Sequence, residues 1–473
     1  MKIMDTDNNR LNKRIFIWEF VWSEDLIRHI IQLCNEKGIE ICGWAVRRKD
    51  IKRLIDVWPD APVFEAPFPS DLNTIDYESD VLQSFKFEEE ENIRFLLDRE
   101  GAYQNNMHSS QARYEVYGWI ETLLKRTKPD WLLFPDVPHN IFTYLLYLSG
   151  KRKGIKIQMI RYGFPPHLLT ISESVERESF KVSLETGSIE LSSQTTEYLK
   201  ALRYDDSQQP IYMLKQRQYI KPFQVIKRLR AKGLDIFTKK SLDAALTYMK
   251  RKRLKRFYES LCDSKLEMTK INPYIVVFLH LQPERTTMPE GGVFAQQWLM
   301  VQMLSQICSA EGYDLYVKEH PSTFMSGPSL YRGRWFYNSL KVLPKVSLVS
   351  TSINSAAILK NANAVATITG TVGLEAVVKG IPTLIFGESV INGCAGTYKI
   401  KGEADLKAAI LSIQKGVEIG FDDVKRFFSA LEQDENTHNT ELTRTADHSS
   451  LWQQGIPQTV MFSKMVQNIE NEK

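Results

Sequence analysis

The chain has 473 residues, 43% of them hydrophobic, so it can bury a large core, and its length predicts roughly two to three domains. Its 61 Lys and Arg residues nearly balance its 57 Asp and Glu residues, which gives a formal net charge of only +4. No overall field therefore points to nucleic acid as a partner.

The cysteines and the apolar runs indicate the compartment. The five cysteines are widely spaced, odd in number and form no CxxC pair: Cys34, Cys42, Cys262, Cys308 and Cys394. This pattern favours free thiols in a reducing compartment over disulfides or a zinc site. The polar N-terminus has no segment of signal-peptide type, and no apolar run reaches the roughly 18 residues of a membrane helix. We therefore expect a cytoplasmic protein.

Strand-like and helix-like patterns alternate in the first part of the chain. Short apolar runs predict strands at 14–21, 39–46, 131–134 and 155–160. Helical spacing of apolar residues predicts helices at 24–36, 112–125 and 142–151. Such alternation predicts a mostly parallel sheet that helices cover on both faces.

The segment 215–258 is strongly basic. It contains fifteen Lys or Arg residues and two acidic residues, a local charge of +13, and its apolar residues have the spacing of amphipathic helices. One interpretation is a solvated helical connector. The alternative is a patch that faces anionic lipid or an anionic polymer.

A second α/β half follows the basic segment. Strands are predicted at 274–279, 315–317, 346–349, 364–368 and 383–386, and helices at 295–309 and 374–379, the latter ending at Gly380. Two such halves predict an α/β fold with two Rossmann-like domains that face a cleft. The predicted division is an N-terminal domain on the acceptor side (1–214), a basic connector (215–265), a nucleotide-sugar-binding domain (266–435) and a tail (436–473) that packs back on the N-terminal domain.

Three polar clusters in the second half follow predicted strands. They are HLQPERTTMPEGG at 280–292, KEHPS at 318–322 and TITGTVGLEAVVKGIP at 367–382. Ligands of open α/β sheets bind at the carboxyl ends of the strands, so the three clusters together predict a nucleotide site.

The third cluster has the most constrained geometry. Thr369, Gly370 and Thr371 form a turn into a helix, where backbone amides and hydroxyls suit a phosphate. Glu375 lies near enough to accept hydrogen bonds from the ribose of the same ligand. The alternative is an ordinary helix N-cap, and the turn lacks the GK[ST] ending of a Walker loop.

The other two clusters offer charged and polar groups. His320 is placed to donate a hydrogen bond to a phosphate, or to protonate it if the histidine pKa is near neutral. Strand alternation lets at most one of Lys318 and Glu319 share its direction. In the first cluster, Gln282 and Arg285 offer donors, and Glu284 offers a carboxylate.

The N-terminal half has one comparable place, FPDVPHN at 134–140, where Asp136 and His139 follow a predicted strand. Prolines on either side of Asp136 restrict this turn. The alternative is an Asx-type turn before the next helix. RYGFPP, which begins at Arg161, is a second candidate rim loop of this half.

The segments HLQPERTT, YVKEHPS, TGTVGLEA and GIPTLIFG together resemble the bacterial capsule-synthesis glycosyltransferase family, which is related to the retaining β-Kdo transferases of GT-B type. The resemblance covers roughly residues 130–395. It implies that the His320–Pro321 dipeptide and the turn at 369–371 bind the phosphate of CMP, with Glu375 near the ribose.

The same resemblance implies a catalytic carboxylate from the N-terminal side of the cleft. Asp136 is the candidate nucleophile, with His139 beside it, and Glu284 is the fallback. Arg161 or Arg285 would hold the carboxylate of the donor sugar, and Gln282 and Lys318 are further candidates for contact with that sugar. The chain has no suitably placed DxD-like motif, in agreement with metal-independent chemistry and no cofactor.

We therefore expect a cytoplasmic glycosyltransferase of capsule or lipopolysaccharide synthesis, and peripheral contact with the inner membrane face is the localisation expected if the basic segment faces anionic lipid. It would transfer Kdo, or a nonulosonic acid such as pseudaminic or legionaminic acid, from a CMP-sugar to a glycan or lipid-linked acceptor with retention. The alternatives are a transferase that uses a UDP-sugar, a GDP-sugar or a CDP-alditol, and a non-catalytic protein of polysaccharide export.

Overall fold

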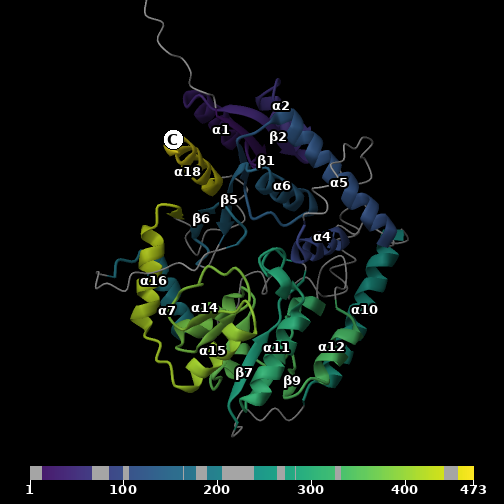
Figure 1. Ribbon diagram of the computed structural model, residues 1–473, viewed down its shortest axis with the longest axis vertical. Helices are drawn as coiled ribbons and strands as arrows, with labels where there is room; N and C mark the ends of the chain where they lie inside the picture. Colours follow the sequence, from purple (N-terminus) through teal and green to yellow (C-terminus); the bar gives the residue numbers. More distant parts are fainter. Residues whose placement is uncertain are drawn as a thin grey trace, which may run out of the picture. The chain divides into compact units, whose positions relative to one another are not determined.

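The computed structural model of the protein describes residues 13–66, 85–99, 106–162, 165–176, 189–204, 239–263, 272–282, 284–324, 332–440 and 456–472. The chain forms two compact units (Figure 1). Unit 1 comprises Met1–Leu97, Ala102–Val175 and Asp434–Lys473, and unit 2 comprises Asp98–Gly101 and Glu176–Gln433. The predicted division ended the N-terminal domain at residue 214, whereas unit 1 reaches only to Val175 before it takes up the chain again at Asp434.

Unit 1 is built on a seven-stranded sheet in the order β13-β6-β5-β4-β1-β2-β3. Its parallel strands are β1 (Arg14–Trp18), β2 (Glu40–Val46), β3 (Val63–Glu65), β4 (Trp131–Phe134) and β5 (Lys156–Tyr162). One side is completed by β6 (Leu168–Ser172), which pairs antiparallel with β5, and by β13 (Thr437–Asn439), which pairs antiparallel with β6. These two strands were not predicted, because each is short and β13 lies in a polar stretch.

The helices of unit 1 join residues from both ends of the chain. They are α1 (Glu24–Glu36), α2 (Arg48–Val57), α4 (Phe87–Arg99), α5 (Asn106–Thr127), α6 (Ile141–Arg152) and α18 (Ile456–Asn471). The Ser23 hydroxyl caps α1 by accepting the Leu26 N–H at 3.2 Å. Figure 1 shows α18 beside α1, and Phe462 of α18 is buried in the same core as Ile27 of α1.

Unit 2 is built on a six-stranded sheet in the order β12-β11-β10-β7-β8-β9, and all its pairs are parallel. The strands are β7 (Tyr274–Phe278), β8 (Asp314–Lys318), β9 (Val346–Val349), β10 (Ala364–Thr367), β11 (Thr383–Ile385) and β12 (Thr397–Lys399). Its helices are α7 (Ser193–Tyr204), α10 (Lys239–Leu261), α11 (Gln297–Ala310), α12 (Arg334–Lys341), α13 (Ser355–Leu359), α14 (Thr371–Val378), α15 (Glu403–Gln414) and α16 (Phe421–Gln433), with the 3-10 turns η2 (Gly292–Ala295) and η3 (Pro321–Phe324).

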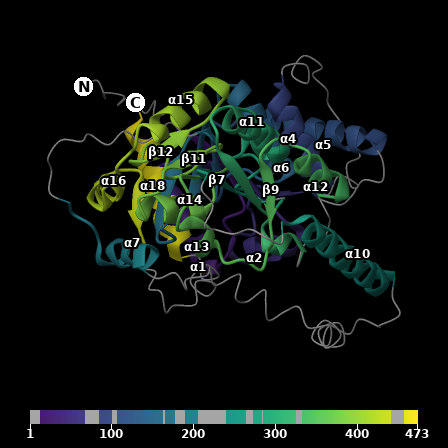
Figure 2. The same ribbon diagram turned by 90° about the horizontal axis from the view of Figure 1, so that it is seen from below.

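The basic segment contributes α10, while residues 205–238, including predicted helical positions, lie outside the described part of the chain. Leu254 and Tyr258 of α10 are buried in the core of unit 2, and the helix packs against α12 (Figure 2). Among the described helices, none is long and apolar enough to cross a membrane.

In each unit the first strand is central, and the chain runs outward from it first to one side and then to the other. The side changes between β1 and β4 in unit 1 and between β7 and β10 in unit 2. Such topological switch points are where open α/β sheets bind ligands, beyond the carboxyl ends of the strands.

Candidate functional site

The three predicted clusters of unit 2 follow three neighbouring parallel strands. β10, β7 and β8 lie side by side in the sheet, so their carboxyl ends share one edge. His280 follows β7, Glu319 and His320 follow β8, and Gly370 lies between β10 and α14. The structure therefore brings the clusters together at the switch point of unit 2.

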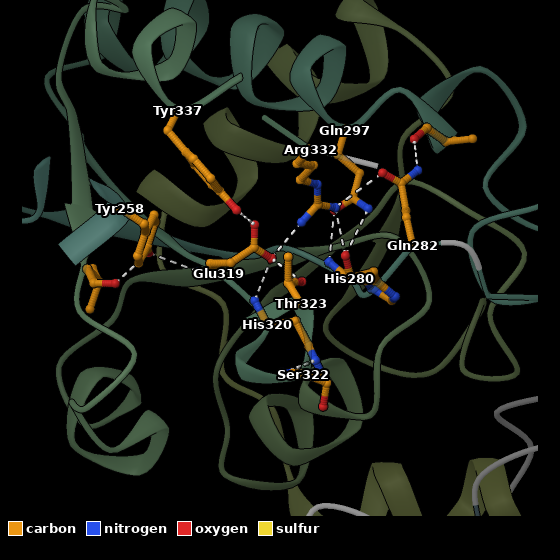
Figure 3. Close-up of polar contacts among 12 residues, drawn as sticks. Tyr258, His280, Gln282, Gln297, Glu319, His320, Ser322, Thr323, Arg332 and Tyr337 are labelled. Carbon is orange, nitrogen blue, oxygen red and sulfur yellow. Dashed lines mark hydrogen bonds and ion pairs between the residues drawn. The ribbon is translucent and has the colours of Figure 1, made fainter. Parts of the chain in front are cut away.

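Glu319 is the centre of a buried polar network (Figure 3). Its carboxylate accepts hydrogen bonds from Arg332 Nη1 at 2.5 Å and from the Tyr337 hydroxyl at 2.8 Å. It also accepts the N–H of His320 at 2.7 Å and the hydroxyl of Thr323 at 3.1 Å. A buried carboxylate needs such partners, so Glu319 fixes the turn that carries His320.

Arg332 extends this network to the end of β7. Its Nη2 donates to the carbonyl of His280 at 2.7 Å and to Oε1 of Gln282 at 3.3 Å. The side chain of Arg332 is 3% exposed and that of Glu319 is fully buried, so the ion pair is an internal support. The loops after β7 and β8 are thereby held in one geometry.

His320 is half-buried at the start of the η3 turn. Its Nδ1 accepts the N–H of Ser322 at 3.2 Å, so in the neutral ring Nε2 carries the proton. Burial lowers the pKa of His320 to about 4, and the charge of Glu319 only partly opposes this shift. Protonation of the phosphate was predicted only for a pKa near neutrality, and the lowered pKa favours the other predicted role, in which His320 is a neutral hydrogen-bond donor at neutral pH.

His280 is a second histidine of this edge, and the sequence assigned it no role. Its Nε2 lies 2.8 Å from the Thr367 hydroxyl and accepts the N–H of Ile368 at 3.3 Å. Burial lowers the pKa of His280 to about 3, with smaller contributions from the charges of His320 and Arg332. The neutral ring thus holds the end of β10 against the end of β7.

The turn into α14 has the backbone that a phosphate site requires. Gly370 is the N-cap residue and supplies no side-chain oxygen to the first N–H groups of the helix. A Cβ atom at this position would lie 2.8 Å from the Thr367 hydroxyl and 3.1 Å from Nε2 of His280. Only glycine therefore fits here without displacing the side chains around it.

The two threonines of this turn differ. The hydroxyl of Thr369 is buried and donates to the carbonyl of Thr286 at 2.9 Å, so it holds the loop after β7. Its predicted use as a donor to phosphate is corrected to a structural role. Thr371, the first residue of α14, is half-buried, and its role stays a prediction.

Glu375 lies on α14, one turn after the N-cap, and is half-buried. Burial raises its pKa to about 7, while Lys379 lowers it by a smaller amount. A carboxyl group with a raised pKa beside a predicted anion site is a functional candidate, and its predicted contact with a ribose stays a prediction.

Two residues predicted to hold the donor sugar have internal roles instead. The ammonium group of Lys318 is buried and donates to the carbonyl of Ile353 at 2.8 Å, on the side of β8 opposite to the Glu319 network. Burial lowers the pKa of Lys318 to about 8. The amide of Gln282 donates to the carbonyl of Ala295 and accepts from Arg332, so it fixes the loop after β7.

Arg161 is the third donor-sugar candidate with an internal role. It is 1% exposed in unit 1, and its Nη2 donates to the carbonyls of Ser174 and Val175 just beyond β6. The guanidinium therefore holds the end of β6 against β5, and it is not presented for a sugar carboxylate.

The remaining candidates of unit 2 keep their predicted status. Arg285 pairs through Nε with Glu290 at 3.5 Å, and both side chains are largely buried. Glu284 is exposed, and its Oε2 accepts the Thr286 hydroxyl at 3.4 Å. Pro321 opens the η3 turn directly after His320.

Asp136 and His139 lie together at the switch point of unit 1. Their nearest side-chain atoms, Oδ2 and Nδ1, are 3.9 Å apart, and each side chain is about a third exposed. Nδ1 of His139 donates to the carbonyl of Val137 at 2.7 Å. Asn140 then caps α6 in a reciprocal capping box with Thr143, which fixes where this turn ends.

Sequence reasoning missed the residues that support the site of unit 2. Tyr258 comes from the basic helix α10, and Arg332 and Tyr337 come from the region of α12. No motif joins them to KEHPS or HLQPERTT, because they meet only through the packing of α10 and α12. Within the described residues, no group of three or more His, Cys, Asp or Glu side chains is arranged to hold a metal ion.

The two Rossmann-like units define the class of the protein, which is a GT-B-like α/β protein. Residues 200–404 match the family model described as "Capsule polysaccharide biosynthesis protein". The resemblance to the capsule-synthesis family is thereby confirmed over that range. No curated protein matches the chain.

Solved structures are similar at low sequence identity. The β-Kdo 2,7 transferase of Thermosulfurimonas dismutans KpsC is 13% identical, with 73% of this chain and 88% of that chain covered and a TM-score of 0.28. The β-Kdo 2,4 transferase of the same KpsC is 12% identical, with 59% and 78% covered and a TM-score of 0.25. The UDP-GlcNAc 2-epimerase of Neisseria meningitidis is 7% identical, with 89% and 99% covered and a TM-score of 0.24. These scores are low, so the fold assignment rests on the strand order of each sheet.

Proposed function

We propose that the protein is a glycosyltransferase of capsule or lipopolysaccharide synthesis that transfers an ulosonic acid from a CMP-sugar to a glycan acceptor. The family match of residues 200–404 supports a role in capsule polysaccharide biosynthesis. The donor, the sugar and the retaining outcome belong to the proposal.

The observation that carries this proposal lies at the carboxyl ends of β10, β7 and β8 in unit 2. There, one buried network holds both the N-terminus of α14 and the turn that carries His320. The α14 N-terminus offers backbone N–H groups, and Nε2 of neutral His320 offers a further donor. Because Arg332 and Glu319 pair internally, they support these donors. The phosphate of a nucleotide is a ligand of the right charge for this edge.

The chemistry follows from the charge that develops in the reaction. When the bond from the anomeric carbon to the phosphate oxygen breaks, CMP leaves with an additional negative charge. Preorganised donors stabilise that charge without having to reorganise. A neutral His320 fits this role, since a donor that keeps its proton stabilises the leaving phosphate without protonating it.

Calorimetric titration tests the nucleotide assignment. CMP is expected to bind more tightly than CDP, UDP or GDP, and His320→Ala is expected to weaken CMP binding about tenfold, the effect of one lost hydrogen bond to a charged group. His438→Ala, a histidine of β13 in unit 1, is the matched control. A preference for UDP or GDP would overturn the donor assignment, and those donors are the alternative functions.

We also propose that α10 contacts anionic lipid. Exposed apolar residues, Leu246, Tyr248 and Met249, lie next to a run of exposed cations that comprises Lys250, Lys252, Arg253, Lys255 and Arg256. Arg251 is buried, so it is not part of this surface. Cations beside exposed apolar groups suit an anionic membrane surface.

Vesicle sedimentation tests the lipid contact. Replacing Lys250, Lys252 and Lys255 by Glu is expected to abolish binding to vesicles that contain phosphatidylglycerol. The same change at the exposed Lys401, Lys407 and Lys415 is the matched control and should leave binding unchanged. Equal binding by both variants would leave α10 as a plain connector.

A further inference from the structure

The switch point of unit 1 carries a glutamate that no motif indicated. Glu19 directly follows β1, while Asp136 and His139 follow β4, the neighbouring strand across the switch point. Arg47 follows β2 on the other side of β1. The ends of adjacent parallel strands therefore bring Glu19 to the edge that already holds the predicted catalytic pair.

The backbone at Glu19 is strained. Glu19 and Phe20 are consecutive non-glycine residues with φ of 57° and 60°, in the left-handed region that side chains disfavour. The surrounding sheet imposes this conformation, because Glu19 N–H donates to the carbonyl of Ala45 at 2.8 Å and Nε1 of Trp44 donates to the carbonyl of Glu19. Strain of this kind persists only where the fold over-determines it, and it is concentrated at functional sites.

The surroundings of the Glu19 carboxylate mix both signs of charge. Its side chain is 22% exposed and pairs with Nε of Arg47 at 3.3 Å, and the same Nε lies 3.3 Å from Asp50. Burial raises the pKa of Glu19, and Asp50 adds to this effect, while the charges of Arg47, His139 and Lys49 oppose it. The carboxylate is therefore a stronger base than an ordinary glutamate and remains accessible to solvent.

A purely structural ion pair would explain the contact of Glu19 with Arg47, but it would not explain the left-handed backbone of Glu19. Glu65 has that simpler role. It lies at the end of the extended strand β3, and its carboxylate accepts a hydrogen bond from Nε of Arg48 at 2.5 Å. Glu19 differs from Glu65 in its left-handed backbone and in its place beside Asp136 and His139. These differences identify Glu19 as the candidate for chemistry.

We propose that Glu19 is a catalytic residue of unit 1 that accepts a proton from a hydroxyl group of a saccharide bound at the switch point between β1 and β4. This inference rests on the proposed transferase function. As the saccharide oxygen bonds to the anomeric carbon of the donor sugar, the bond from that carbon to its leaving oxygen breaks. The electron pair stays with the leaving oxygen, and the hydroxyl proton moves to Glu19.

Transfer kinetics with CMP-Kdo and a Kdo-terminated oligosaccharide test the proton transfer. Glu19→Ala is expected to lower the transfer rate about 10²- to 10⁴-fold, the usual contribution of a general base, with CMP affinity unchanged. Added formate should restore part of the rate by replacing the missing carboxylate. Glu65→Ala is the matched control and should show neither the loss nor the rescue. A full rate in Glu19→Ala, or a loss without rescue, would overturn the proposal.

A second measurement does not depend on turnover. NMR of protein with ¹³C-labelled glutamate side chains, with the Glu19 carboxyl assigned from Glu19→Gln, is followed while methyl glycosides of Kdo, galactose and N-acetylglucosamine are added. The Glu19 signal is expected to shift with at least one glycoside and the Glu65 signal with none. No shift of Glu19 would overturn the site, whereas a shift in a protein that neither binds CMP nor transfers sugar would overturn only the proposed function.

Discussion

The two switch points share one strand order but differ in chemistry. In unit 2 the edge is lined by neutral histidines and a helix N-terminus, and the buried Glu319 carboxylate is paired with Arg332. In unit 1 the edge carries Glu19 and Asp136 as carboxylates with considerable solvent access. The same fold thus offers one edge that suits binding an anion and one that suits moving a proton.

This difference comes from the loops rather than from the sheets. The central strands of both units are buried and largely apolar, so they set only where the loops begin. The residues directly after β1 and β4, or after β7, β8 and β10, then decide the charge of each edge. Function is placed on a fold in this way and does not follow from the fold itself. The predictions below test whether the two edges act separately.

The largest expected effect is on the edge of unit 1. Asp136→Ala is expected to lower sugar transfer about 10³-fold or more if Asp136 is the nucleophile, because covalent catalysis then loses its attacking atom. CMP binding should be unchanged, since the nucleotide is assigned to unit 2. Glu284→Ala is the comparison variant, measured by product formation and by CMP calorimetry. An active Asp136→Ala together with an inactive Glu284→Ala would move the nucleophile to unit 2.

The next effect concerns the support of unit 2. Arg332→Met is expected to lower the free energy of unfolding by about 3–5 kcal/mol, because it leaves the buried Glu319 carboxylate without its partner. Urea unfolding followed by fluorescence measures this change. Lys341→Met breaks the half-exposed pair with Asp263 and should cost less than about 1 kcal/mol. Equal costs for the two variants would contradict the role given to the buried network.

A smaller effect is expected at the turn into α14. Gly370→Ala should cost about 1–3 kcal/mol of stability and weaken CMP binding, because the new methyl group displaces Thr367 or His280. Gly402 is the matched control, since it is also a helix N-cap and a Cβ there meets no atom within 4 Å. Thermal unfolding and calorimetry of both variants test this contrast. Unchanged CMP affinity in Gly370→Ala would argue against a ligand at this turn.

The smallest effect is a pH dependence from Glu375. Burial raises the pKa of Glu375 to about 7, whereas the same side chain in the unfolded protein has a pKa near 4.5. Between these two pH values the folded protein therefore holds a proton that the unfolded chain has already released. This stabilising contribution is present below pH 4.5 and is lost as the pH rises through about 7. The stability of Glu375→Gln relative to the wild type should therefore rise by about 2 kcal/mol between about pH 5 and about pH 8, allowing for partial exposure.

Urea unfolding across this pH range measures the effect, and Glu403→Gln on the exposed surface of α15 corrects for the loss of one negative charge. A difference between Glu375→Gln and wild type that stays constant with pH would contradict the raised pKa.

Much of the fold could be predicted because local patterns determine it. The predicted bounds of α1, β4 and β9 agree with the structure, since each is a compact apolar run or an amphipathic repeat with clear ends. β6 and β13 were missed because a short edge strand depends on its partner more than on its own sequence. The tail was predicted to pack back on the N-terminal domain, and α18 does lie in unit 1. The helix itself and its contact with α1 were not predicted, because that contact spans nearly the whole chain.

The strand ends that carry the candidate residues were predicted, but the contacts of several of their side chains were not. The strand ends were correct because hydrophobic runs mark them, and residues such as His320 follow directly. Arg161, Lys318 and Gln282 were misassigned because their side chains bind carbonyls that sequence alone could not place. Glu19 was overlooked because its left-handed backbone is a property of the sheet around it.

The central claim is that unit 2 holds the nucleotide phosphate at its switch point. A crystal structure of the protein with CMP tests it most directly. We expect the phosphate within hydrogen-bond distance of the first N–H groups of α14 and of Nε2 of His320, with the ribose beside Glu375. A phosphate bound anywhere else, with this edge filled by water, would contradict the account.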